Sequence, residues 1–115
     1  MSRDARVHLE DVLESIRRIN AYVTGLDETG LGADELRLDA VVRNLEVIGE
    51  AVKQLPEEIT QERSHVEWRK IAGLRDILIH HYFGIDVGII WDVVQNKLPD
   101  FEREVRAILD SMADR

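Results

Sequence analysis

Apolar residues recur every three or four positions along most of this chain, which is the spacing of an amphipathic α-helix. No segment alternates apolar and polar residues as a half-buried strand does. The pattern therefore predicts an all-α fold, an antiparallel bundle of four or five helices. The positions that mark the first two helices are Val12, Ile16, Ile19 and Val23, then Leu36, Val41, Leu45, Ile48, Val52 and Leu55.

Proline and glycine predict where these helices end. The first helix spans residues 4–24, and the glycine-containing residues 25–33 that follow it are predicted to form a loop. Pro56 ends the second helix because it cannot continue the backbone hydrogen bonding. Residues 57–63 fit either a helical turn or a loop. Pro99 is predicted to kink or split the last helix.

Polar residues predict where the later helices begin. Ser64 and Glu67 have the spacing of a capping box, in which each side chain bonds the other's backbone amide, so the third helix is predicted to start at His65. Asp86 is a suitable N-cap for the last helix. Gly84 is a suitable stop for the third, since glycine tolerates the left-handed conformation at a helix end.

Length and composition limit the class of protein. With 115 residues, the chain fits one domain over residues 1–115. It lacks cysteine, which leaves no disulfide framework and no thiolate chemistry. The start of the chain carries no apolar run, and no stretch approaches the ~18 apolar residues of a membrane span. We therefore expect a cytoplasmic protein with no membrane partner.

The net charge of −8 argues against a general nucleic-acid binder, which is usually basic. The charge is uneven, because four cations outnumber three acids by one within residues 61–82. A polyanion would have to meet this segment, and its binding should weaken with salt. The cations are Arg63, Arg69, Lys70 and Arg75, and the acids are Glu62, Glu67 and Asp76.

The candidate chemistry lies in residues 75–82, which place polar residues inside an apolar helical pattern. Arg75 is a permanent planar cation that can grip phosphate oxygens, and His80 can exchange a proton near neutral pH. The two are five residues apart, so they diverge by roughly 140° on a straight helix. They can meet at one phosphate only if the helix unwinds near His80 or a second copy of the chain completes the site. Asp76 is four residues before His80 and could hold one of its ring nitrogens.

The second helix adds weaker candidates. Asn44 and Glu50 interrupt its apolar stripe and could contact Arg75, while Gly49 could let another helix approach closely. Taken singly, each of these residues also fits an ordinary structural role, such as a surface ion pair. No histidine pair has the spacing of a helical zinc motif, and no glycine-rich phosphate loop occurs, so no metal or cofactor is predicted.

The motif Arg75-x4-His80-x-Tyr82 resembles the HEPN signature of the HepT-like toxin family. The flanking residues 68–74 and 83–86 agree with it, and residues 43–51 resemble that family's second helix. The resemblance covers nearly the whole chain. It implies an all-α bundle that dimerises with the two signature motifs at the interface, which would bring Arg75 and His80 around one site.

The resemblance also implies a function. HepT-like proteins are toxins and metal-independent endoribonucleases, paired with a minimal nucleotidyltransferase antitoxin. That antitoxin uses ATP and Mg²⁺ to transfer AMP onto the signature tyrosine, here Tyr82. On an RNA substrate, His80 would act as general base or acid, Arg75 would stabilise charge on the phosphoryl oxygens, and Asp76 would orient His80.

Two other interpretations stay open. The chain could be a binding subunit that docks a nucleotidyltransferase and presents a nucleotide, without ribonuclease activity; the acidic composition favours this. It could also be a purely structural helical dimer, in which case the polar residues 75–82 could be replaced without effect.

Overall fold

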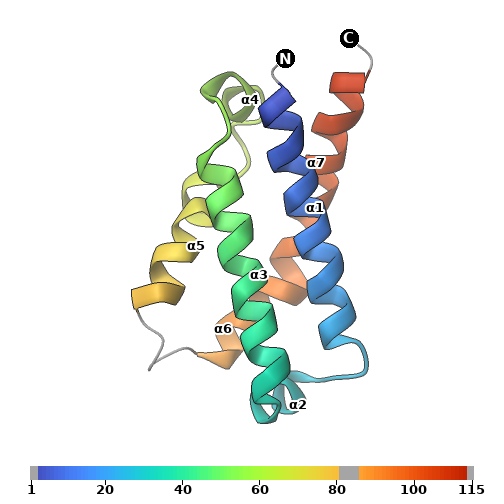
Figure 1. The fold of residues 1–115 in the computed structure, drawn as a ribbon, viewed down its shortest axis with the longest axis vertical. Coiled ribbons are helices and arrows are strands. Elements are labelled where there is room, and N and C mark those ends of the chain that lie inside the picture. The colour runs from blue at the N-terminus through green and yellow to red at the C-terminus, as the bar shows by residue number, and fades with distance from the viewer. Residues whose placement is uncertain (1–2, 81–85, 114–115) are drawn as a thin grey trace.

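The computed structural model describes residues 3–80 and 86–113, and these ranges contain helices and no β-strand, which confirms the all-α prediction. Figure 1 shows α1 and α3 side by side along the long axis, with α5 on the outer side of α3 and α7 beyond α1. The elements in chain order are α1 (Arg3–Val23), α2 (Glu28–Ala33), α3 (Glu35–Lys53), α4 (Glu57–Glu62), α5 (Trp68–His80), α6 (Val87–Asp92), the π-helical η2 (Val93–Lys97) and α7 (Leu98–Ala113).

The core lies where α1 packs against α3 and α7. The predicted stripe of α1 is buried as expected, with Val12 and Ile19 fully inaccessible. Leu36 is an exception to the stripe predicted for α3, because its side chain is 85% exposed. It lies five residues before Val41, which turns it roughly 140° away from the buried face. None of the helices in the described ranges is long and apolar enough to span a bilayer.

The loop predicted for residues 25–33 is partly wrong, because α2 occupies its second half. Asp27 caps this helix by accepting a hydrogen bond from the Gly30 amide at 2.7 Å. Leu31 is completely buried against the core and holds the short helix in place. The glycines in this segment led to the prediction of a loop, whereas the helix is stabilised by the Asp27 cap and by burial of Leu31.

The third predicted helix begins later than expected, at Trp68 rather than His65. The capping box is not formed, since the Glu67 carboxylate pairs with Lys70 at 2.6 Å. The chain instead turns before α5, where the Trp68 indole donates to the Arg63 carbonyl at 3.0 Å. Trp68 also packs edge-on against Phe101, with ring centroids 5.6 Å apart, as expected for a core residue.

The last helix is broken near Pro99, as predicted. Asp86 caps α6 through a 2.8 Å hydrogen bond from the Gly88 amide. The break itself is the π-helical segment η2, after which the Leu98 amide donates to the Val93 carbonyl, five residues back. Pro99 follows in the first turn of α7, where its missing amide costs little. The predicted stop at Gly84 lies outside the described residues, and residues 57–62 form α4.

Candidate functional site

The helix that carries the candidate residues, α5, lies very close to α3 at Gly49. A Cβ added to Gly49 would stand 3.1 Å from the Arg75 backbone nitrogen, 3.1 Å from the Ile71 oxygen and 3.3 Å from the Ala72 oxygen. These are backbone atoms, which cannot rotate aside as a side chain can. The close approach predicted for Gly49 is confirmed, and it fixes the backbone of Arg75 against α3.

The side chain of Arg75 pairs with Glu50 on the neighbouring helix. Its Nε lies 3.3 Å from Glu50 Oε2, and the two side chains are 41% and 50% exposed. The contact predicted between these residues is therefore present. An ion pair this exposed adds only about 0–1 kcal/mol to stability, so its main effect is to orient the guanidinium.

Asp76 also faces α3, where its Oδ1 lies 3.5 Å from Lys53 Nζ. The same oxygen is 3.8 Å from Arg75 Nη1. Asp76 thus has two cationic neighbours that sequence reasoning did not assign to it. The His80 backbone ends α5, whereas the His80 side chain and the whole of Tyr82 lie outside the described residues. The expected contact between Asp76 and His80 stays a prediction.

Asn44 was expected as a possible contact of Arg75, but its side chain bonds elsewhere. It is buried in α3, and its side-chain amide donates to the Ala40 carbonyl at 2.9 Å. It does not line the hollow that Arg75 reaches. Asn44 therefore satisfies its amide within its own helix rather than on Arg75.

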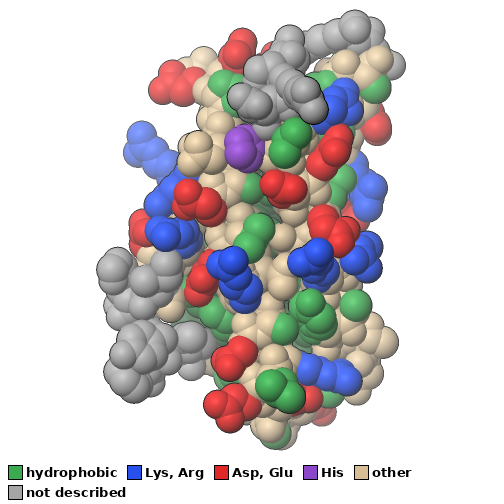
Figure 2. Space-filling view, viewed as in Figure 1, with side chains coloured by type: hydrophobic (Ala, Val, Ile, Leu, Met, Phe, Trp, Pro, Cys, Tyr) green, Lys and Arg blue, Asp and Glu red, His purple; other side chains and the backbone are tan. Residues whose placement is uncertain are grey.

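A groove of about 470 Å³ opens beside Arg75, between α1, α3 and α5. Figure 2 shows the corresponding face, where basic side chains form a band across the middle and acidic ones are interleaved with them. The groove is lined by acidic side chains, by basic side chains and by a short apolar stretch on α3. Its lining residues are His8, Asp11, Arg43, Glu46, Val47, Glu50, Ala51, Gln54 and Arg75.

Sequence reasoning missed the contribution of α1 to this groove. His8 and Asp11 are three residues apart and share one face of α1, so their spacing could have grouped them. It gave no sign that α3 would pack beside that face, because this depends on the tertiary contact between the two helices. Within the described ranges, no three histidine or acidic side chains converge as a metal-binding group.

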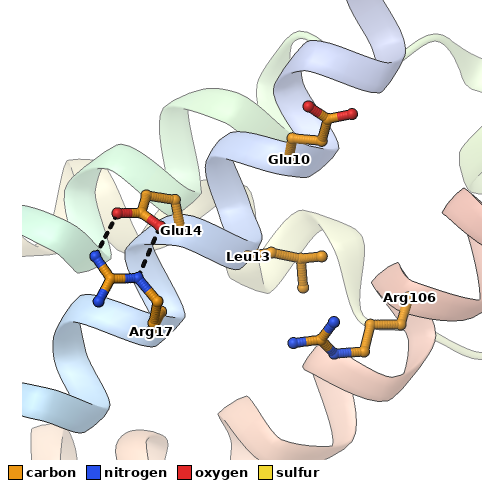
Figure 3. Close-up of a pocket in the computed structure, with 5 residues that line it drawn as sticks. All are labelled: Glu10, Leu13, Glu14, Arg17 and Arg106. Carbon is orange, nitrogen blue, oxygen red and sulfur yellow. Dashed lines mark hydrogen bonds and ion pairs between the residues drawn. The ribbon is translucent and has the colours of Figure 1, made fainter.

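A second, smaller hollow of about 230 Å³ lies between α1 and α7. Figure 3 shows Leu13 at its centre, with Arg106 of α7 on one side and the Glu14–Arg17 pair on the other. Arg17 donates to Glu14 at 2.6 and 2.9 Å, which lowers the pKa of Glu14 to about 2. Arg106 is bonded to Glu102 at 2.8 Å. Both arginines are already paired, so this hollow offers no free cation to a ligand.

Comparisons with known proteins agree on one family. The family model described as "Ribonuclease HepT-like" matches residues 12–108. "Putative RNase MJ0127" of Methanocaldococcus jannaschii is 44% identical over 107 residues, which cover 93% of this chain and 88% of that protein. "Putative RNase TTE0752" of Caldanaerobacter subterraneus is 41% identical over 104 residues, which cover 90% of this chain and 93% of that protein.

A longer relative carries the same region. "Gamma-glutamylcyclotransferase and putative RNase MJ0434" of Methanocaldococcus jannaschii is 38% identical over 112 residues, which are 97% of this chain. The chain spans 50% of that protein's length. No solved structure gives a significant match.

Proposed function

We propose that this chain, which belongs to the ribonuclease HepT-like family, is a metal-independent endoribonuclease that cuts RNA with Arg75 and His80. The observation that carries the proposal is the position of Arg75. Its guanidinium is partly exposed, oriented by Glu50, and lies at the edge of an open groove. A cation in this setting can receive a phosphodiester from solvent while its backbone stays fixed against α3.

RNA supplies its own nucleophile, so the reaction needs only proton transfer and charge stabilisation. As general base, His80 takes the proton from a ribose 2′-hydroxyl, whose oxygen then bonds to the adjacent phosphorus. The bond from phosphorus to the 5′-oxygen breaks, and that oxygen takes a proton from water as it leaves. The products are a 2′,3′-cyclic phosphate and a 5′-hydroxyl. Arg75 stabilises the extra negative charge on the phosphoryl oxygens in the transition state.

The site is composite, formed by two protomers. On a regular α5, Arg75 and His80 point roughly 140° apart, so one protomer cannot easily direct both at a single phosphate. A two-fold dimer would bring the α5 helices of two chains together, so that Arg75 of one protomer faces His80 of its partner. This homodimer is part of the proposal.

The chain acts as the toxin of a two-component pair. The cognate antitoxin is a minimal nucleotidyltransferase that transfers AMP from ATP to the Tyr82 hydroxyl, with pyrophosphate as the leaving group. Tyr82 is seven residues after Arg75, and on a regular helix two positions so spaced would lie within roughly 20° of one stripe. A bulky anionic nucleotide there would compete with RNA for the guanidinium and repel the RNA backbone.

Two assays test the proposal. The purified protein should cut RNA in the presence of a chelator, and Arg75→Ala should abolish cutting while the helical content is kept. Incubation with the nucleotidyltransferase and labelled ATP should label the wild type and Tyr22→Phe, but not Tyr82→Phe. Tyr22 is the matched control, since these are the two tyrosines of the chain. Cutting that survives Arg75→Ala would refute the catalytic assignment.

A second candidate is a non-catalytic subunit that binds a nucleotide and docks a nucleotidyltransferase. The observation that favours it is the charge of the groove, where Asp11, Glu46 and Glu50 lie with Arg43 and Arg75. Reversible nucleotide binding without labelling and without RNA cutting would support this candidate.

A further inference from the structure

We infer that the groove beside Arg75 holds a guanine base of the RNA, read by Glu46 and Arg43. This inference rests on the proposed function and deepens it by assigning base specificity to the same site. The groove combines two opposing electrostatic features. A groove with three acidic side chains is a poor place for an RNA backbone, yet Arg75 at its edge is suited to a phosphate.

Three charged side chains of the lining, those of Asp11, Arg43 and Glu46, form no ion pair within the part of the chain that the structure describes, and two of them belong to α3. Glu50, by contrast, is already paired with Arg75. Arg43 and Glu46 are three residues apart, so they lie on one face of α3. On the groove wall they offer a fork of donors and a pair of acceptor oxygens about one helical turn apart, both unpaired within the described ranges.

Guanine has the complementary edges. Its N1–H and N2–H groups are adjacent donors that one carboxylate can accept together, and its O6 and N7 accept from an arginine. Adenine and cytosine each place a ring acceptor beside their amino group, and uracil has a single N–H between two carbonyl oxygens. A carboxylate that meets these bases faces a lone pair instead of a second donor, which disfavours them.

The groove also suits a base by size and shape. Its volume of about 470 Å³ lies within the roughly 300–1,000 Å³ of small-molecule sites. Val47 and Ala51 give it an apolar patch on α3, against which the face of a base can pack. The acidic groove then excludes phosphate while accepting the base, and the phosphodiester stays outside with Arg75.

Binding of non-cleavable RNA tests the assignment without relying on catalysis. The probes are four 2′-O-methyl pentanucleotides that differ only in the central base, G, A, C or U. The wild type should bind the guanine probe about tenfold more tightly than the others, and Glu46→Gln should remove most of that preference. Glu35→Gln is the control, because Glu35 is exposed on the same helix and does not line the groove. Equal affinity for the four probes, or a preference that survives Glu46→Gln, would overturn the inference.

Arg43→Ala separates a base contact from a phosphate contact. This substitution should weaken binding of the guanine probe and leave binding of the other three probes nearly unchanged. Equal weakening of all four, with a shallower salt dependence, would mark Arg43 as a phosphate contact and overturn its role here. Cutting of natural RNA is scored separately. Guanine-specific binding without cutting would refute the proposed function alone, whereas cutting together with base-independent binding would refute this inference alone.

Discussion

The Nε of Arg75 lies 3.3 Å from the Glu50 carboxylate, across the contact between α5 and α3. One residue before Glu50, Gly49 meets the Arg75 backbone, so main chain and side chain of this arginine are both held by neighbouring positions of α3. The tight contact at Gly49 fixes the position of the Arg75 backbone, and the exposed ion pair with Glu50 orients its guanidinium group.

Glu50→Gln tests the ion pair. Removing the carboxylate charge should lower kcat for RNA cutting roughly tenfold, because the guanidinium is no longer held in position. The thermal midpoint should change little, since exposed pairs contribute about 0–1 kcal/mol. Steady-state kinetics and a melting curve measure the two effects. Glu58→Gln on α4 is the control, and unchanged kcat in Glu50→Gln would show that the pair is incidental.

Gly49→Ala tests the close approach of the two helices. The added methyl group would stand 3.1 Å from two backbone atoms of α5, so the helices must separate. Overpacking of this kind costs about 1–3 kcal/mol, which urea unfolding can measure. The same change should reduce RNA cutting, because α5 carries Arg75.

Gly73→Ala is the matched control on the other helix. A Cβ at Gly73 meets nothing within 4 Å, so this change should be neutral or stabilise α5 by up to about 1 kcal/mol. If the two substitutions had the same effect on stability, the packing argument for Gly49 would fail.

The sequence predicted the larger features of the fold because they depend on local pattern. The stripe of α1, the cap at Asp86 and the break near Pro99 follow from spacing and backbone chemistry, and the structure has all three. It also predicted the contact of Glu50 with Arg75 and the role of Gly49. These two residues were found because they interrupt an apolar stripe.

The errors arose where side chains have partners other than those that the local pattern suggests. Ser64 and Glu67 have capping-box spacing, but Lys70 takes the Glu67 carboxylate and the Trp68 indole takes the Arg63 carbonyl. The missed α2 depends on burial of Leu31, and the groove depends on α1 lying beside α3. No local pattern encodes which helix will lie opposite a given side chain.

The turn before α5 gives a prediction about pH. Glu104 on α7 bonds His65 at 2.7 Å and Arg63 at 2.9 Å, and these contacts hold the pKa of Glu104 below its ordinary value of 4.5. The Glu104 carboxylate therefore binds a proton more readily in the unfolded chain than in the folded one. The stability from this carboxylate is complete above about pH 4.5 and is lost as the pH falls through the lower, folded-state pKa.

Urea unfolding of the wild type and Glu104→Gln at several pH values measures this effect. The difference in unfolding free energy should be largest near neutral pH and shrink between about pH 5 and pH 3. Glu58→Gln, at an exposed position of α4, should show no such trend. A difference that stays constant over this range would mean that the cluster does not contribute through the Glu104 charge.

In the proposed composite site, Arg75 of one protomer and His80 of its partner act together at one phosphodiester. The direct measurement is RNA cutting, with chelator present, by wild type, Arg75→Ala, His80→Ala and an equal mixture of the two variants after exchange of subunits. Each variant alone should be inactive. The mixture should recover about one quarter of the wild-type rate, because half the dimers are mixed and each has one intact site. Full cutting by either variant alone, or no recovery in the mixture, would contradict the composite site.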